Sequence, residues 1–205
     1  MKLQLALDRL TREECLFIIH ETEKEIDWIE VGTSVIKEYG MSLVREIREL
    51  YPDKMIVVDM KTLDTGGHEA IQSFEAGADI TTVMAIASDR TITDTLEIAA
   101  KYGKRVMVDL LEVTSKSRVQ QLKGLGVDLV GVHIGKDKQV PGKFDKKHFS
   151  IVKDFDLEVS VAGGIDFENL PGVLTCKPDI VIVGSTISKA SNSKYSARRI
   201  KDTIT

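Results

Sequence analysis

Three segments of the chain share one pattern: GADITTV (residues 77–83), GVDLVGV (126–132) and KPDIVIV (177–183). In each segment a turn leads to an aspartate, and the aspartate is followed by a short apolar run rich in β-branched residues. Such a run is typical of a parallel strand that is covered on both faces. The repeat therefore predicts an α/β fold in which one structural unit recurs along the chain.

Five further apolar runs complete a regular series. They are LQLAL (3–7), DWIEV (27–31), MIVVDM (55–60), RVMVDL (105–110) and EVSVAG (158–163). Between the runs lie segments with apolar residues at every third or fourth position, such as SLVREIREL (42–50), TITDTLEIAAKYG (91–103) and SRVQQLKGLG (117–126), which indicate helices. Gly103 and Gly126 follow two of these helices, where a positive φ is often needed. About eight units of roughly 25 residues predict a single (β/α)8 TIM barrel over residues 1–205.

Other classes of protein fit the sequence less well. A doubly wound open sheet uses the same units, but no GxGxxG motif follows the first strand. The formal net charge of −4 gives no electrostatic reason to expect a nucleic acid as partner. No apolar run reaches the ~20 residues that span a bilayer, and MKLQLALDRL (1–10) has no signal-peptide pattern, so we expect a cytoplasmic protein that does not bind membranes. Cys15 and Cys176 lack a metal-ligand or CxxC spacing and are expected to be packing residues.

Ionisable residues recur where the predicted strands end, which is the end of a barrel that carries the chemistry. They are Asp8, Glu30, Asp59, Lys61, Asp64, Asp109, Glu112 and His133. Any single carboxylate could instead cap the helix that follows it. Clustered carboxylates, however, repel one another unless a cation offsets their charge. Oxygen ligands without paired cysteines suit a hard divalent ion, so the sequence predicts Mg²⁺, a lysine, or both at this end of the barrel.

The segment VVDMKTLD (57–64) is the most informative part of this set. Asp59 and Lys61 are two residues apart, so they share one face of a continuing strand, and Asp64 lies just beyond them. A lysine among carboxylates keeps its proton and can stabilise an enediolate oxyanion. A solvated loop with surface ion pairs is the simpler alternative.

Two glycine-containing strand ends, AGGI (162–165) and VGST (183–186), follow the predicted strands seven and eight. Barrels often bind phosphate at these two positions through backbone N–H groups, and glycine permits the close approach. His133 ends strand six and can exchange a proton near neutral pH, so we expect it to act in catalysis. The other histidines, His20, His68 and His148, have no comparable setting and are expected to be surface or packing residues.

Across its whole length the chain resembles the orotidine-monophosphate-decarboxylase-like barrels, of the ribulose-phosphate-binding type. Within them it is most similar to the 3-hexulose-6-phosphate synthases and 3-keto-L-gulonate-6-phosphate decarboxylases. The DxKxxD pattern of Asp59, Lys61 and Asp64 is the most specific mark of the resemblance. It implies that Glu30 and Asp59 bind Mg²⁺, that Lys61 contacts a cis-enediolate intermediate, and that Asp64 reaches into the partner's site of a homodimer with shared active sites. It also implies a sugar phosphate bound by a set of residues that includes Asp8, Lys136, Ala162, Gly163, Gly164, Gly184 and Ser185.

A few positions bear on which of the two activities the chain has. Asp109, Ala162 and Ser185 stand where the decarboxylase typically has glutamate, threonine and arginine, and all three favour the synthase. Lys136 favours the decarboxylase, which usually has arginine there. The resemblance thus implies Mg²⁺-dependent condensation of ribulose 5-phosphate with formaldehyde, with His133 as the base and Asp109 assisting. Decarboxylation of 3-keto-L-gulonate 6-phosphate is the main alternative; metal-free orotidine-monophosphate decarboxylation, ribulose-phosphate epimerisation and a non-catalytic sugar-phosphate sensor are others.

Overall fold

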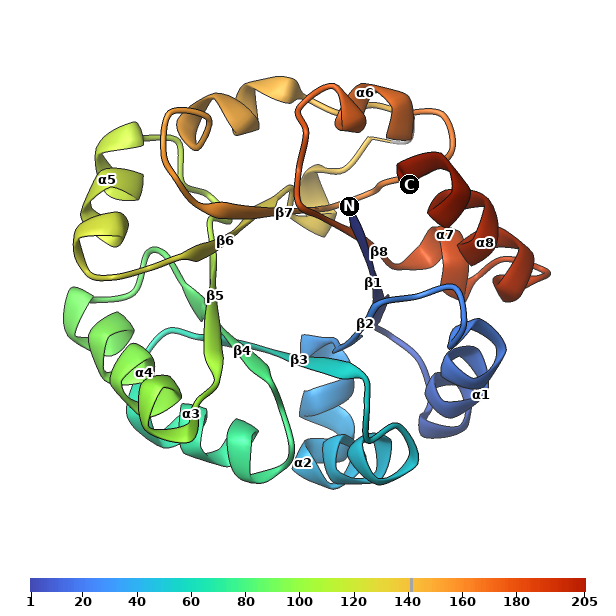
Figure 1. Cartoon of the computed structure of the whole chain (residues 1–205), viewed down its shortest axis with the longest axis horizontal. Helices are drawn as coiled ribbons and strands as arrows, with labels where there is room; N and C mark the ends of the chain where they lie inside the picture. The colour runs from blue at the N-terminus through green and yellow to red at the C-terminus, as the bar shows by residue number, and fades with distance from the viewer. Residues whose placement is uncertain (141) are drawn as a thin grey trace.

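Each apolar run of the sequence forms a strand, and each strand pairs in parallel with the next one along the chain. The computed structural model describes residues 1–140 and 142–205. Within them the strands are β1 Lys2–Leu7, β2 Trp28–Val31, β3 Met55–Thr62, β4 Ile80–Met84, β5 Arg105–Asp109, β6 Leu129–His133, β7 Glu158–Ala162 and β8 Ile180–Val183. Because β1 also pairs with β8, the sheet closes into a barrel (Figure 1). The predicted (β/α)8 barrel is confirmed, and the open sheet is excluded.

Helices surround the barrel (Figure 1). They are α1 Arg12–Thr22, α2 Thr33–Leu50, α3 Gly66–Glu75, α4 Asp89–Tyr102, α5 Lys116–Gly124, α6 Leu170–Leu174, α7 Ser185–Ser188 and α8 Ser193–Ile204. The three helical segments named from the sequence lie in α2, α4 and α5. Gly103 ends α4 with a φ of 64°, as its position predicted. None of the helices in the described residues has the length and apolar character needed to cross a membrane.

The sixth unit departs from the strict alternation of strand and α-helix. Between β6 and β7 the described residues form only two 3₁₀ helices, η1 Lys136–Lys138 and η2 Lys146–Ile151. The sequence of this connection contains Gly135, Pro141 and Gly142 among scattered lysines. Glycine and proline disfavour a helix interior, and the segment lacks the apolar period that would hold an α-helix against the barrel.

The period of two along each strand sorts the side chains between the barrel interior and the outer core. The interior core is formed by Trp28, Val57, Ile80, Met107, Leu129, Ile180 and Ile182. Outward residues such as Ile29 and Val58 are fully buried in the separate core that includes the helices. Two residues beyond Trp28, Val57 and Met107 come Glu30, Asp59 and Asp109. The carboxylates of Glu30, Asp59 and Asp109 therefore lie one layer above a largely apolar floor.

Asp79 and Asp179 of the repeat, together with Asp27, fasten neighbouring strands to each other at the other end of the barrel. Asp79, just before β4, accepts a hydrogen bond from the Ile56 backbone N–H at 2.9 Å, and its own N–H donates to the Ile56 carbonyl at 2.8 Å. The same pair of bonds joins Asp179 to Val159 and Asp27 to Leu3. Since these bonds satisfy backbone donors at strand starts, they explain why an aspartate precedes β2, β4 and β8. Asp128, before β6, instead pairs with Arg105 at 2.8 Å.

The two glycines that begin α3 provide a test of helix packing next to the predicted site. A Cβ on Gly66 would lie 2.3 Å from the Thr91 carbonyl oxygen, whereas the nearest atom to a Cβ on Gly67 is 3.6 Å away. We expect Gly66→Ala to destabilise the protein by ~1–3 kcal/mol through overpacking. Gly67→Ala should be neutral or stabilising by up to ~1 kcal/mol because alanine favours the helix. Urea unfolding measures both variants, and equal stability would contradict this description of the packing.

Candidate active site

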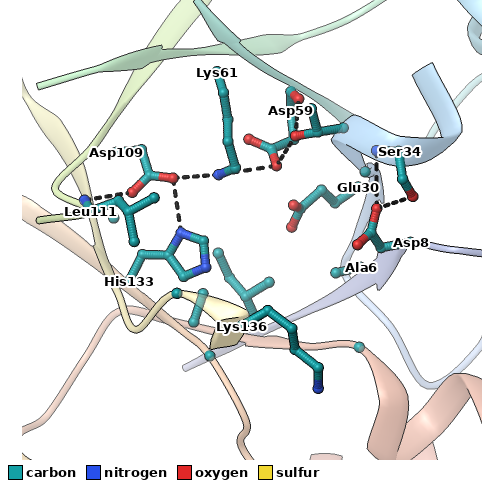
Figure 2. Close-up of a pocket in the computed structure, with 18 of the residues that line it drawn as sticks. Ala6, Asp8, Glu30, Ser34, Asp59, Lys61, Asp109, Leu111, His133 and Lys136 are labelled. Atoms are coloured by element: carbon teal, nitrogen blue, oxygen red, sulfur yellow. Dashed lines mark hydrogen bonds and ion pairs between the residues drawn. The ribbon is translucent and has the colours of Figure 1, made fainter. Parts of the chain in front are cut away.

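A cavity of about 640 Å³ opens at the carboxyl ends of the strands. Its volume is in the range of small-molecule sites. Figure 2 shows charged side chains from different strands turned toward one another in it. The predicted site residues that line it are Asp8, Glu30, Asp59, Lys61, Asp109, His133, Lys136, Ala162, Gly163, Gly164, Gly184 and Ser185. The structure thus brings twelve of the fourteen residues singled out from the sequence into one cavity, and leaves Asp64 and Glu112 outside it.

Lys61 lies between two carboxylates at the centre of the charged cluster (Figure 2). Its Nζ is 3.2 Å from Asp59 Oδ2 and also donates to Asp109 Oδ2. Burial lowers the pKa of Lys61, but the charges of Asp59 and Asp109 outweigh burial and raise that pKa above its ordinary value. The amine therefore carries its proton near neutral pH and can face a developing oxyanion.

Asp109 also orients His133. Its Oδ2 lies 2.9 Å from His133 Nδ1, and its Oδ1 accepts the Leu111 backbone N–H at 2.8 Å. Burial raises the pKa of Asp109, but the hydrogen bond and charge of His133, together with Lys61, lower it to about 2. Because Asp109 has no proton to donate, Nδ1 of His133 must carry the hydrogen of this bond. Nε2 is then the nitrogen free to exchange a proton with a molecule in the cavity.

Glu30 and Asp59 form the acidic side of the cavity. Glu30 accepts a hydrogen bond from Gln4 Nε2 at 2.6 Å. Burial, and then the charge of Asp59, raise the pKa of Glu30 to about 7. The negative charge of Asp59 thus opposes ionisation of Glu30, and a divalent cation between the two carboxylates would offset this repulsion.

The donor set fits Mg²⁺ with few protein ligands. Within residues 1–140 and 142–205, no three histidine, cysteine, aspartate or glutamate side chains are grouped so as to hold a metal. Mg²⁺ commonly binds one or two carboxylates and keeps several waters, so a pair is sufficient. Glu30 and Asp59 are the residues that would hold it.

The glycine-containing ends of β7 and β8 line the cavity, as predicted. Gly163 has a φ of 110°, and a Cβ there would lie 2.3 Å from the Ile134 carbonyl oxygen. Only glycine satisfies both the conformation and the space. The Thr186 hydroxyl donates to the Ile165 carbonyl at 2.6 Å and so ties the two strand ends together. They form one wall of the cavity, on which a phosphate could rest.

Asp8 and Lys136 lie nearer the rim of the cavity (Figure 2). Asp8 Oδ1 accepts the Ser34 backbone N–H at 3.0 Å, in the first turn of α2, and also the Ser34 hydroxyl. The helix-capping alternative therefore applies to Asp8, although the residue also lines the cavity. Lys136 is exposed on η1, and its Nζ lies 3.2 Å from Gln139 Oε1.

Asp64 is the predicted site residue that lies outside this lining. It is exposed beyond β3, where its Oδ1 accepts the Thr65 backbone N–H at 2.8 Å. Glu112, noted at the end of β5, is also outside and pairs with Lys138 at 2.6 Å. Its φ of 64° turns the chain after the strand. Position at a strand end was thus not sufficient to place Glu112 in the cavity.

Some polar lining residues were missed by sequence reasoning. The Thr82 hydroxyl donates to Asp59 Oδ1 at 2.8 Å, the Thr33 hydroxyl lies 2.8 Å from both Asp59 Oδ2 and the Asp59 carbonyl oxygen, and Gln4 bonds to Glu30. Gln4 Oε1 is buried without a hydrogen-bond partner among the described residues. The sequence did contain a signal for two of these residues, because side chains two apart on a strand share a face. Gln4 shares the inward face of β1 with Ala6, which pairs with Glu30, and Thr82 shares the inward face of β4 with Ile80.

Comparison with known proteins gives a consistent result. Residues 1–200 match the family model "Orotidine 5'-phosphate decarboxylase / HUMPS family". The chain is 38% identical to 3-hexulose-6-phosphate synthase of Bacillus subtilis over 100% of this chain and 99% of the relative. Among solved structures, 3-hexulose-6-phosphate synthase from Salmonella typhimurium has a TM-score of 0.95 at 35% identity, covering 100% of this chain and 98% of that one. KGPDC from Streptococcus mutans has a TM-score of 0.92 at 28% identity, covering 99% of this chain and 96% of that one.

The bond between Asp109 and His133 can be tested by titration. Burial lowers the pKa of His133, but the hydrogen bond and charge of Asp109 raise it above its ordinary value. Asp109→Asn removes that charge and leaves the burial, so we expect the pKa of His133 to fall relative to wild type. NMR titration of the imidazole carbon-bound protons in both proteins measures it. An unchanged or higher pKa would show that Asp109 does not control His133.

Proposed function

The chain belongs to the orotidine 5'-phosphate decarboxylase / HUMPS family, and we propose on that premise that it is a 3-hexulose-6-phosphate synthase. Such an enzyme is an aldehyde-lyase, here acting on ribulose 5-phosphate and formaldehyde in the direction of condensation. The synthases that match the chain along its full length support this activity. One observation carries the proposal: a lysine between two carboxylates faces the same cavity as an oriented histidine and two glycine-containing strand ends.

We propose that the phosphate rests on the wall formed by Gly163, Gly164, Gly184 and Ser185. The sugar carbonyl and its neighbouring hydroxyl would then extend across the cavity toward Glu30, Asp59 and Lys61. Mg²⁺ held by Glu30 and Asp59 would supply Lewis-acid polarisation of the carbonyl. The partly apolar wall, which includes Ala162 and Ile182, limits the water around the reacting carbons.

The proton transfer is assigned to His133. Its Nε2 would remove a proton from carbon 1, while Asp109 holds Nδ1 and favours the imidazolium that forms. The Lys61 ammonium would stabilise the negative oxygens of the enediolate. Carbon 1 would then bond to the carbon of formaldehyde, and the aldehyde oxygen would take up the proton that His133 carries. The product is 3-hexulose 6-phosphate.

Decarboxylation of 3-keto-L-gulonate 6-phosphate is the second candidate, because Lys136 lines the same cavity. A cation there could assist protonation of an intermediate after carbon dioxide leaves. The similarity to KGPDC at 28% identity also supports this alternative. Asp109, Ala162 and Ser185, all in the cavity lining, favour the synthase by the resemblance described above.

The activity is tested by supplying each substrate to the purified protein with Mg²⁺. We expect formation of 3-hexulose 6-phosphate from ribulose 5-phosphate and formaldehyde to be faster than carbon dioxide release from 3-keto-L-gulonate 6-phosphate. A chelator should abolish the condensation, because two adjacent carboxylates would remain without their cation. Faster decarboxylation would instead select the second candidate.

His133→Ala tests the role of the proposed base in the same assay. One positioned proton-transfer group contributes ~10² to 10⁴ in rate, so kcat should fall by about that factor while the fold is kept. Circular dichroism and thermal unfolding check the fold. Near-normal turnover would remove His133 from the mechanism.

We further propose a homodimer with shared active sites. Asp64, part of the DxKxxD pattern, lies outside the cavity of its own chain. Beside it Leu63 is 56% exposed, and Ile86, beyond the neighbouring strand β4, is 57% exposed. Large apolar side chains at a surface suit a subunit contact, and a two-fold interface would bring each Asp64 toward the other subunit.

Subunit mixing tests the shared site. Lys61→Ala and Asp64→Ala homodimers should each be nearly inactive. After joint unfolding and refolding, mixed dimers with one complete site should restore about one quarter of wild-type activity, because half the dimers are mixed and half their sites are complete. Analytical ultracentrifugation verifies the dimer. No recovery in a verified mixture would mean that Asp64 serves its own chain or neither.

A further inference from the structure

The strand that carries Asp59 and Lys61 is irregular at these two residues. The pairing of β3 with β4 shifts after Val58 and resumes at Thr62, so that three residues of β3 lie opposite Thr82 alone. Lys61 has a φ of 50°, in the left-handed region that costs free energy for a residue other than glycine. Such a bulge aims side chains away from the ordinary pleat, but something must hold it.

Thr82 makes the contacts that hold it. Its hydroxyl accepts the Lys61 backbone N–H at 2.8 Å and donates to Asp59 Oδ1 at 2.8 Å. A hydroxyl has one proton to donate and an oxygen that can accept, so the Thr82 hydroxyl can accept from the Lys61 N–H and donate to the Asp59 carboxylate at the same time. The side chain is 3% exposed, which shields both bonds from competing water.

This network also fixes the carboxylate from two sides. The Thr33 hydroxyl, at the start of α2, lies 2.8 Å from both Asp59 Oδ2 and the Asp59 carbonyl oxygen and shares its one proton between them, while Thr82 donates to Oδ1. The Lys61 ammonium then contacts Asp59 Oδ2 at 3.2 Å. Thr82 is therefore the residue that touches both members of the pair, one through its backbone and the other through its side chain.

We propose that Thr82 is a positioning residue for the reaction, and that its hydroxyl sets the bulge that makes Asp59 and Lys61 converge. The inference rests on the proposed synthase function for its kinetic consequence only. Since the phosphate wall lies on β7 and β8, on the other side of the barrel, loss of the hydroxyl should disturb the chemistry more than substrate binding. The effect belongs to kcat rather than KM.

Substitutions at Thr82 distinguish the effect of the hydroxyl group from the effect of the size of the side chain. Thr82→Val keeps the size and removes both bonds, so kcat should fall by ~10- to 100-fold, as for other residues that orient a reactive group, with KM within about threefold of wild type. Thr82→Ser keeps the hydroxyl and should retain most of kcat. Equal losses in the Val and Ser variants, or a wild-type kcat in Thr82→Val, would overturn the proposal.

Thr81 provides a matched control on the same strand. It is 1% exposed, faces outward, and its hydroxyl bonds to Ser73 Oγ at 3.1 Å, away from the cavity. Thr81→Val should leave kcat and KM unchanged. If it lowers kcat as much as Thr82→Val, the effect is general destabilisation of β4, and the inference fails.

Crystal structures of Thr82→Val and Thr81→Val test the geometry without the reaction. We expect Lys61 to leave the left-handed region, or Asp59 to rotate, in the Thr82 variant only. If Thr82→Val does not fold, Thr82→Ala takes its place with the same expectation. If the wild-type protein has no synthase activity but the bulge shifts in Thr82→Val, the proposed function is refuted and the role of Thr82 in holding the bulge stands. If the bulge is unchanged in Thr82→Val, that role is refuted.

Discussion

The ammonium group of Lys61, set between Asp59 and Asp109, is the interaction on which the charged interior of the barrel depends. Burying an ionised carboxylate is costly unless it is paired and hydrogen-bonded. One amine serves two carboxylates here, and His133 serves Asp109 as well. The third carboxylate, Glu30, has no such ion pair: it accepts an amide hydrogen bond from Gln4, and burial together with the charge of Asp59 raises its pKa. The cluster is therefore balanced on the Asp109 side and acidic on the Glu30 side.

The closed parallel barrel converts this electrostatic arrangement into geometry. Alternate residues of every strand face inward, and the apolar floor that includes Trp28, Val57 and Met107 fills the interior beneath the charged residues. Because these apolar side chains fill the space below them, the carboxylates point toward the open end of the barrel. Meanwhile the aspartate bonds at the opposite end, such as Asp79 to Ile56, keep neighbouring strands in register. Stability and chemistry are thus assigned to the two ends of the same strands.

Much of this could be predicted from the sequence because the strands are short, apolar and evenly spaced. Strand ends located Glu30, Asp59 and Asp109, since inward positions there face a shared mouth. The left-handed backbone of Lys61 could not be predicted, because no local residue preference demands it and the Thr82 hydroxyl that accepts its N–H comes from the neighbouring strand. The 3₁₀ connection after β6 was missed for a different reason: the expected repeat outweighed its glycines and proline.

Tertiary context also separated residues that look equivalent in the sequence. Asp8 and Asp109 both follow apolar runs, but Asp8 bonds to the first turn of α2 and Asp109 bonds to two cationic or ionisable side chains. The difference lies in what stands opposite each strand end, which is a helix start for Asp8 and the β3 bulge for Asp109. A sequence gives the position of a carboxylate in its own strand, whereas its role depends on the neighbouring strands.

The same cluster imposes opposing demands on His133. A general base must be unprotonated before it acts, yet Asp109 raises its pKa and so reduces the neutral fraction at a given pH. The compensation is that a more basic Nε2 removes a proton more readily once it is neutral. Lys61 limits the rise, since its positive charge acts on His133 in the lowering direction. The Lys61 ammonium would therefore have two effects: it would stabilise the enediolate oxygens, and it limits the rise in the pKa of the base that would form the enediolate. The proton transfer and the oxyanion contact thus depend on the same charge.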